Sequence, residues 1–409
     1  MNSDTGRKMR KRMDIQVRLD GSREDALGTQ WRAGLASPIF VLRAESDGHT
    51  SLCRAGGPPL RQWNDPIEAL RWLDQHRRTL PDHRWVGYIA YDLGRWFEDI
   101  PQTAADDLGL PLFIFTCHPL NPQPLPLPED TEDAGKYQGS NFTPIAYQAA
   151  IARAIDYIGA GDIFQVNLSQ RFHVRSTLSP QAMYSRIQRQ YPAWYGALLA
   201  YGEFAIVCNS PELFLHTRQD GTGLWHVTTR PIKGTRPRLP GMAEQLRRSD
   251  KDQAELNMII DLERNDLGRV CRLGTVRVTE PRVIEQHPTV YHGAATVEGV
   301  LREGIGLVDL LAATFPGGSI TGAPKIRAMQ IIDELEPTRR GPYCGAIGML
   351  DADGSILLNI AIRILIVKGN DVWIPVGGGI VADSTPQGEY DETLVKALAA
   401  MSVLGVKPK

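Results

Sequence analysis

The sequence predicts an α/β (α+β) protein in which mixed sheets are covered by helices. Three observations support this class. Apolar or alternating runs of strand length recur along the chain, and stretches with helical periodicity lie between them. The length of 409 residues also exceeds what one hydrophobic core usually serves. We therefore expect two domains or one large two-lobed unit.

The N-terminal third contains both kinds of element. Residues 38–45 have the pattern of a strand, and residues 67–80 have that of an amphipathic helix. Residues 85–98 have the pattern of a buried strand that runs into a turn. This region should therefore contribute both to a sheet and to its helical cover.

Proline, acidic and small polar residues dominate 118–140, which is typical of a surface segment between folded units. We place a boundary there, between an N-terminal domain of residues 1–135 and a second domain of residues 142–405. The basic residues at 7–12 are followed by no apolar segment. This favours a short disordered tail over a targeting signal.

After the boundary the pattern becomes regular. Ile151, Ile155 and Ile158 recur at helical spacing, and Gly159 and Gly161 should end that helix. An alternating strand should follow at once, and later segments have the apolar character of buried strands: 204–210, 355–367 and 371–381. Helices are expected around Asp252, Ala328 and Val395, which completes the alternation.

The composition excludes several classes of function. Formal net charge is −2, so no global basic field would attract nucleic acid or anionic lipid. No apolar run approaches the roughly 18 residues that span a bilayer. The five cysteines are scattered and never form a CxxC pair, which argues against a disulfide framework or structural zinc. We expect a cytoplasmic protein that binds neither membranes nor nucleic acid.

A first candidate site lies on the helix expected from Ser249 onward. Ser249 and Asp252 have the spacing of a helix start with a capping-box-like pair. Further along, Glu255 shares a face with Met258 and Ile259. A carboxylate on an apolar face is costly unless it is paired or coordinates a metal. A buried salt bridge and a metal site both remain open.

A second acidic helix follows three glycines at the end of a strand, where a ligand could approach the backbone. Thr385 and Pro386 suit its first turn, and Glu389, Glu392 and Lys396 share one face. Taken alone, that face could simply be solvated. Together, however, the two acidic helices could supply an oxygen site for Mg²⁺, if they meet in the fold.

Two basic features could act on an anionic substrate. Lys233 lies between Pro231 and Gly234 among arginines, where burial and nearby cations would lower its pKa and make it a nucleophile. A solvated basic turn is the alternative. Arg363, inside the apolar strand expected at 355–367, needs an acidic partner or a substrate carboxylate. A Gly-rich turn at 316–323 offers N–H groups to an anion.

No GxSxG, Walker or zinc-type motif occurs. Instead, seven ordered strings between Gly161 and Thr393 closely resemble the chorismate-utilising enzymes. These strings are GDIFQVNLSQRF, SPELFL, PIKGT, DLERNDLGRV, GGSITGAPK, LNIAIRI and GGGIVADS followed by EYDET. GYIAYDLGR at 87–95 is a weaker match. The resemblance implies a two-lobed, anthranilate-synthase-like fold in which two antiparallel sheets pack face to face with helices outside.

The resemblance also implies roles for individual residues. It implies Mg²⁺ as cofactor, with Glu255 and Glu392 as direct ligands and Asp252 and Glu389 as supporting residues. Relatives often have Glu at the position of Asp252. The implied contacts to chorismate are His292 near the ring and its departing hydroxyl, Arg363 and Tyr343 at a carboxylate, the backbone of Gly377 and Gly379 around it, and Ser319.

Two positions separate the subfamilies. Isochorismate and salicylate synthases resemble one another in a basic lysine where this chain has Gln165, and an amide cannot accept a proton from water at neutral pH. Lys233 is similar to the lysine of aminodeoxychorismate synthase component I. The corresponding residue of anthranilate synthases is small, and they are the alternative.

The implied reaction begins with attack of Lys233 on C2 of chorismate, while Glu212 protonates the departing C4 hydroxyl. Ammonia from a separate glutamine amidotransferase subunit then gives 4-amino-4-deoxychorismate, for p-aminobenzoate and folate synthesis.

Overall fold

The computed structural model describes residues 15–21, 31–33, 37–120 and 134–406. The basic residues at 7–12 lie outside the described residues, and so does the part of the proline-rich segment from 121 to 133. Every statement on the fold below concerns the described residues.

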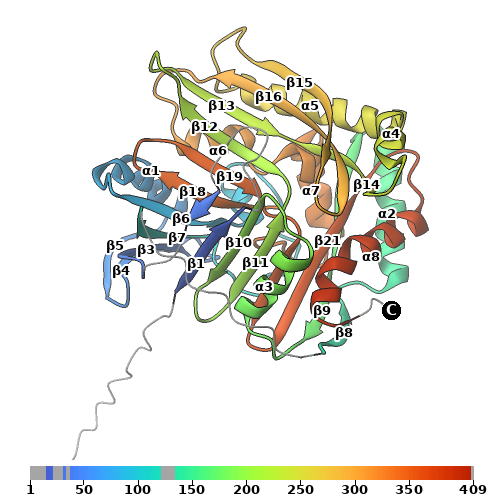
Figure 1. Ribbon diagram of the computed structural model, residues 1–409, viewed down its shortest axis with the longest axis horizontal. Helices are drawn as coiled ribbons and strands as arrows, with labels where there is room; N and C mark the ends of the chain where they lie inside the picture. Colours follow the sequence, from blue (N-terminus) through green and yellow to red (C-terminus); the bar gives the residue numbers. More distant parts are fainter. Residues whose placement is uncertain (1–14, 22–30, 34–36, 121–133, 407–409) are drawn as a thin grey trace, which may run out of the picture.

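Two sheets organise these residues, and every pair of neighbouring strands in them is antiparallel (Figure 1). Sheet A has nine described strands, eight of which follow one another in the order β17 (Gly322–Ala323), β9 (Gln165–Arg175), β21 (Asp371–Ile380), β20 (Ile364–Lys368), β11 (Ala205–Ser210), β10 (Tyr195–Ala200), β1 (Gln16–Asp20) and β2 (Arg32–Ala33). The ninth, β8 (Lys136–Ser140), pairs with β9.

Sheet B has twelve strands within the described ranges. Eleven follow one another in the order β14 (Ile232–Pro237), β16 (Val290–Val300), β13 (Trp225–Arg230), β12 (Leu213–Gln219), β19 (Ile356–Ile360), β18 (Ala346–Asp351), β6 (His83–Ile89), β7 (Phe113–Pro119), β3 (Phe40–Ala44), β4 (Thr50–Arg54) and β5 (Pro59–Trp63). The strand β15 (Arg277–Gln286) also pairs with β16.

Helices connect and cover these strands: α1 (Pro66–His76), α2 (Pro144–Gly159), α3 (Pro180–Gln190), α4 (Met242–Arg247), α5 (Asp250–Gly268), α6 (Leu307–Thr314), α7 (Lys325–Leu335) and α8 (Pro386–Val403). Three short 3₁₀ turns accompany them: η1 (Arg77–Thr79), η2 (Tyr91–Trp96) and η3 (Gly318–Ile320). The helix starts follow local sequence. Ser249 caps α5, and Thr385 caps α8 with Pro386 in its first turn, as expected.

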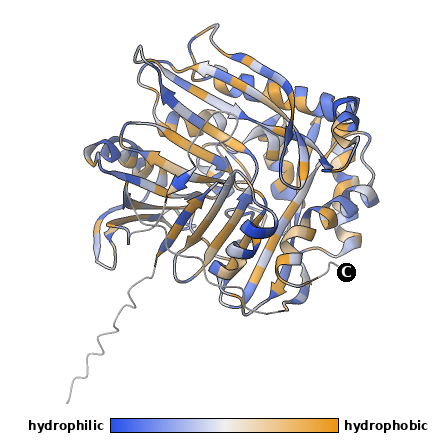
Figure 2. Cartoon of the chain, in the orientation of Figure 1, coloured by the Kyte–Doolittle hydropathy of each residue, from blue (hydrophilic) through white to orange (hydrophobic). Residues whose placement is uncertain are grey.

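The alternation of side chains along β20 shows how the layers pack. Ile364 and Ile366 belong to a core shared by the two sheets, whereas Leu365 and Val367 point to the opposite face. On that face they join a second core with α3 and α8. In Figure 2 the strands β10 and β11 are coloured largely hydrophobic, while α4 on the periphery is hydrophilic. The central strands β10, β11 and β20 are therefore buried on both faces, which explains why their sequences are nearly continuously apolar.

These observations confirm the prediction of a mixed α/β fold with two antiparallel sheets and helices. The expected boundary near residue 135 falls between β7 and β8. Strands from its N-terminal side belong to both sheets, because β1 pairs with β10 and β6 pairs with β18. The described cysteines are free. No helix in the described residues combines the length and apolarity that a bilayer crossing requires.

One strand prediction was wrong. Residues 355–367 do not form a single strand, because β19 ends at Ile360 in sheet B and β20 begins at Ile364 in sheet A. Arg363 lies between them in the left-handed region, with φ of 54°. Hydropathy detects an apolar run but not the left-handed residue that interrupts it. The chain thus passes from one sheet to the other at a predicted site residue.

Candidate functional site

Lys233 lies in β14 rather than in a solvated turn, so that alternative was wrong. Its ammonium donates a hydrogen bond to the backbone oxygen of Ser319 at 3.2 Å. A Cβ atom built on Gly379 would lie 3.6 Å from Lys233 Nζ. Burial lowers the pKa of Lys233, while the carboxylates of Glu255 and Glu212 oppose that shift. Three separate elements therefore meet at one amine.

Glu212, directly before β12, lies beside this amine and is only 4% exposed. The backbone N–H of Ile232 donates to Glu212 Oε1 at 3.4 Å. Burial raises the pKa of Glu212 to about 7, against the opposing effects of the Ser319 hydroxyl and Lys233. Ser319 Oγ is buried and has no hydrogen bond of normal geometry to any described residue, although it lies close enough to affect Glu212. A carboxyl of this kind is half protonated near neutrality and can act as an acid.

The two acidic helices α5 and α8 contribute to the same region. Glu389 Oε2 and Glu392 Oε1 would lie 2.8 and 3.8 Å from a Cβ atom on Gly378. Burial raises the pKa of Glu255. The charge of Lys233 opposes this rise, and the charges of Asp252 and Glu392 reinforce it. The structure thus brings together the carboxylates predicted from two helices.

Each acidic side chain has a distinct environment. Glu389 is 6% exposed, so the solvated alternative is wrong for this residue, whereas the Glu392 side chain is 49% exposed. Glu392 forms an ion pair with Lys396 at 2.5 Å, and Asp252 forms one with Arg236 at 2.8 Å. Glu255 lies 4.0 Å from Lys251.

In the described part of the chain no three His, Cys, Asp or Glu side chains converge closely enough to form a metal site by themselves. Mg²⁺ does not require such a cage, since it retains several waters and shares one or two carboxylates with an anionic ligand. Glu389 Oε1 accepts from Ser384 Oγ at 2.6 Å, but its buried Oε2 has no hydrogen-bond partner among the described residues. A buried carboxylate oxygen without a donor fits a cation site.

The expected carboxylate-binding groups also lie near α8 and β21. Arg363 Nη1 donates to the backbone oxygen of Lys396 at 3.0 Å, and Lys396 Nζ donates to that of Gly377 at 2.9 Å. No ion pair to Arg363 occurs among the described residues. Tyr343 is 4% exposed, and burial holds the pKa of its phenol well above the ordinary value. Arg363 therefore retains donors that a carboxylate could use.

His292 lies on β16, opposite Thr235 of β14. Its Nδ1 lies 2.9 Å from Thr235 Oγ1. Burial, followed by the charges of His287 and Arg363, lowers the pKa of His292 to about 3. The imidazole is consequently neutral at physiological pH, and it can form hydrogen bonds but cannot supply a proton as an imidazolium.

The structure places two further polar groups here, Gln165 and Glu263. The sequence assigned neither of them a binding or catalytic role, and Gln165 was noted only as the position of a lysine in isochorismate and salicylate synthases. Gln165 is fully buried with both amide atoms unpartnered among the described residues, and it contacts the space above Gly379. Glu263 is buried against Thr229, and burial raises its pKa to about 8. Its presence in the DLERND string was the available signal. A single acidic residue in a helix is normally solvated, so the string did not reveal this burial.

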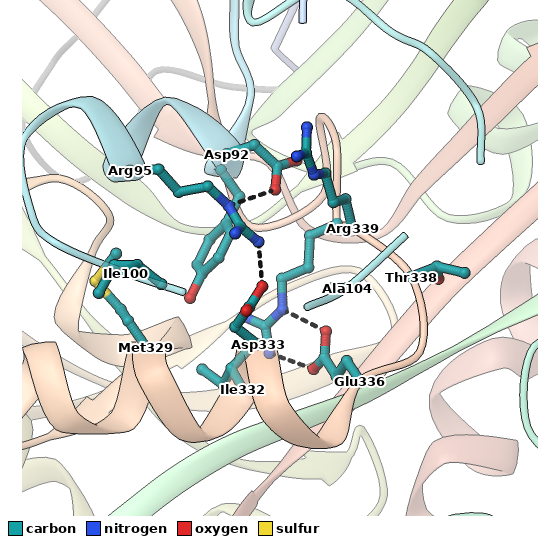
Figure 3. A pocket seen from close by; sticks show the side chains of 12 residues that line it. Asp92, Arg95, Ile100, Ala104, Met329, Ile332, Asp333, Glu336, Thr338 and Arg339 are labelled. Atoms are coloured by element: carbon teal, nitrogen blue, oxygen red, sulfur yellow. Dashed lines mark hydrogen bonds and ion pairs between the residues drawn. The ribbon is translucent and has the colours of Figure 1, made fainter. Parts of the chain in front are cut away.

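A small pocket between η2 and the end of α7 is lined by none of the predicted site residues (Figure 3). Arg95 pairs there with Asp333, and Arg340 forms a two-pronged ion pair with Glu336. Arg340 also donates to the backbone oxygens of Ile320 and Asn167 at 3.0 and 2.6 Å. Through Arg340, this pocket is linked to the residue after Ser319 and to β9.

Comparison with known proteins agrees with this arrangement. The family described as chorismate binding enzyme matches residues 30–402, and the chain belongs to this family. It is a chorismate-utilising enzyme of the anthranilate synthase and aminodeoxychorismate synthase type.

Three relatives illustrate the likeness. The chain is 42% identical to anthranilate synthase component 1 of Thermus thermophilus, over 78% of this chain and 77% of the relative. It is 34% identical to aminodeoxychorismate synthase component 1 of Bacillus subtilis, over 93% and 90%. The crystal structure of anthranilate synthase component I from Streptococcus pneumoniae superimposes with a TM-score of 0.77 at 28% identity, covering 98% of this chain and 95% of that one.

Proposed function

We propose that this chain is component I of an aminodeoxychorismate synthase, which converts chorismate and ammonia to 4-amino-4-deoxychorismate. The observation that carries the proposal is Lys233, a primary amine at the meeting point of β14, η3 and the end of β21. Its lowered pKa favours the neutral form that a nucleophile needs. The likeness to the Bacillus subtilis protein supports the same assignment.

The proposed reaction has two displacements. Lys233 Nζ forms a bond to C2 of chorismate, both conjugated ring double bonds shift by one position toward C4, and the C4–O bond breaks. Glu212 supplies the proton with which the hydroxyl leaves as water. Ammonia then bonds to C4, both double bonds return to their original positions, and the C2–N bond breaks so that its electron pair returns to Lys233. The transient attachment directs ammonia to C4 instead of C2.

The remaining predicted residues would bind and orient the substrate. Arg363 and Tyr343 would hold one carboxylate, with the backbone of Gly377 and Gly379 beside it. Neutral His292 would face the ring near the departing hydroxyl, and Ser319 would contact the substrate beside Glu212. Each of these roles stays a prediction.

Glu255 and Glu392 would hold Mg²⁺, with Asp252 and Glu389 in support. When bound, Mg²⁺ would anchor a substrate carboxylate and offset its charge. The relatives are named component 1, which supports a separate ammonia-supplying subunit, proposed here to be a glutamine amidotransferase. The product would serve p-aminobenzoate and folate synthesis. Five free cysteines fit a reducing cytoplasm.

The alternative is anthranilate synthase component I. The 42% identity to the Thermus thermophilus protein favours it, and it would use the same substrate-binding groups. It would require ammonia to bond at C2, where Lys233 is proposed to attach. A basic side chain at that position is therefore the feature that separates the two candidates.

Product identity tests the proposal. Purified protein is incubated with chorismate, Mg²⁺ and ammonium at mildly alkaline pH, and the products are separated by chromatography with mass detection. We expect 4-amino-4-deoxychorismate, which an added lyase converts to p-aminobenzoate. Anthranilate would overturn the assignment and select the alternative. Bound but unconverted chorismate would overturn both.

A further inference from the structure

The end of the β15–β16 hairpin gathers three titratable side chains on one face. The hairpin closes where His287 N donates to Val290 O at 2.9 Å. The pairing of β15 with β16 places Glu285 opposite His292. His287 follows Glu285 by two residues, the spacing that returns a side chain to the same face of a strand. Hairpin register thus places a second histidine beside the predicted site histidine.

The contacts around His287 are close and buried. Its ring centroid lies 4.8 Å from that of His292, with an interplanar angle of 75°. The ring of Trp194 also packs against His287, with 4.3 Å between the two ring centroids. His287 is 4% exposed and its Nε2 lies 3.4 Å from Glu285 Oε2. His287 is therefore enclosed between an aromatic ring, a carboxylate and the imidazole of His292.

Charged groups hold this arrangement from several elements. Arg230 of β13 donates to Glu285 Oε1 through Nε at 2.8 Å, and also pairs with Glu280 of β15. These contacts hold the Glu285 carboxyl group in place beside His287. Arg363, where the chain crosses between the sheets, carries a charge that helps to lower the pKa of His292.

His292 is held mainly at the edge of its ring. Nδ1 lies 2.9 Å from Thr235 Oγ1, and a hydrogen bond with the backbone of Gly234 opposes the lowering of its pKa. Hydrogen bonds at a ring edge do not pack against the ring face, so they leave the tilt of the ring about its side-chain torsions open. An aromatic ring packed edge to face removes that freedom. Trp194 lies directly before β10 of sheet A and packs against the His287 ring. This contact restricts movement of His287.

We propose that His287 is a positioning residue for His292: it packs edge to face against that imidazole and, backed by Trp194 and Glu285, fixes its direction toward the substrate ring. The inference rests on the proposed placement of His292 in the chorismate site. His287 does not itself contact substrate in this proposal, so its effect should pass entirely through His292.

The test compares His287→Phe, His287→Leu and His287→Ala with His292→Ala and the double variant His287→Ala/His292→Ala. Rates are measured as chorismate consumption, which does not depend on which amino product forms. Thermal unfolding of each variant identifies losses that come from folding. His287→Phe keeps a flat ring, whereas His287→Leu keeps a bulky side chain without a ring. Comparing the two separates the effect of ring packing from the effect of occupying the same volume.

We expect His287→Leu and His287→Ala to lower kcat about 10-fold, with KM for chorismate within about twofold. His287→Phe should stay within about threefold of the unaltered protein. In the double variant, kcat should equal that of His292→Ala alone, since coupled residues are not additive. Additive losses, or equal losses in His287→Phe and His287→Leu, would overturn the proposal.

A second readout does not depend on turnover. Histidine ring NMR of the labelled protein follows the protonation of His292. Removal of His287 should raise the pKa of His292, because a lowering charge and part of the enclosure are lost. An unchanged pKa of His292 in His287→Ala would contradict the proposed contact between the two rings. If the unaltered protein consumed no chorismate while this shift appeared, the proposed function would fail and the His287–His292 coupling would stand.

Discussion

Lys233 and Gly379 belong to different sheets and face each other across the candidate site. A Cβ atom on Gly379 would lie 3.6 Å from Lys233 Nζ and 2.6 Å from Gln165 Nε2. Because Gly379 has no side chain, the Lys233 amine and the Gln165 amide can both lie close to the end of β21. Several expected outcomes follow from this geometry and from the charges around it.

Gly379→Ala should lower kcat/KM on the order of 10-fold. The new methyl group would displace the Gln165 amide, whereas its distance from Lys233 Nζ is an ordinary contact. Steady-state kinetics with chorismate measure the effect. Gly159→Ala is the matched control, because a Cβ atom there meets nothing within 4 Å. Unaltered kinetics for Gly379→Ala would show that this space is not used by substrate.

Lys233→Ala should slow formation of the amino product on the order of 100-fold, equivalent to about 2.7 kcal/mol of transition-state stabilisation. It should also abolish any covalent adduct, since the nucleophilic amine is gone. Rapid quenching followed by intact-protein mass spectrometry detects the adduct, with Lys136→Ala as the control for loss of an exposed lysine. An undiminished rate would refute the nucleophile role and leave the family assignment unaffected.

Glu212 should impose a pH dependence. An acid must be protonated to act, so kcat/KM should fall as pH rises through the pKa of Glu212, about 7. Rates must be expressed per unprotonated ammonia, whose concentration rises over the same range. Glu212→Gln should lower the rate by about 10²–10⁴ and remove this alkaline decline. Persistence of the decline in Glu212→Gln would assign it to another group.

Glu255→Gln should weaken Mg²⁺ binding by about 10-fold or more, since a neutral amide replaces an anionic ligand. Calorimetric titration with Mg²⁺ measures this directly, without turnover. Asp261→Asn removes an exposed carboxylate from the same helix, where it pairs with Arg264, and serves as the control. Equal affinities in the two variants would place the metal elsewhere.

Glu263→Gln should stabilise the protein increasingly as pH rises. The folded-state pKa of Glu263 is raised from 4.5 to about 8. The stabilising contribution of the neutral carboxyl is therefore complete below about 4.5 and is lost as pH rises through about 8. The glutamine variant lacks this loss and should exceed the unaltered protein by about 1–3 kcal/mol at the alkaline end. A difference in unfolding free energy that stays constant with pH would contradict the assignment.

Local features of the fold were predictable from sequence. Ser249 and Thr385 begin α5 and α8 because capping is a contact between residues three apart. Ile151 and its neighbours define α2 through periodicity alone. Strand partners were not predictable in this way, because alternation reveals which face is buried but not which strand lies alongside. The left-handed turn at Arg363 likewise leaves no trace in hydropathy.

The candidate site was accessible from sequence only through ordered motifs. Periodicity placed Glu255 and Glu389 on faces of two helices, but only tertiary structure brings these helices to one region. The burial of Glu389 and Glu263 and the enclosure of His287 depend on residues far away in the chain. Such environments are set by packing rather than by local spacing.

The interleaving of N-terminal strands with both sheets limits how this chain can be divided. A fragment beginning after β7 would leave β18 without β6 and β10 without β1. Each sheet would then end in an apolar edge strand whose backbone groups are unpaired. Such a fragment would aggregate before it formed the site. The proposed site residues, although concentrated in the later part of the sequence, are therefore not a transferable module, and recombination of this gene with its relatives should succeed only when both parts are inherited together.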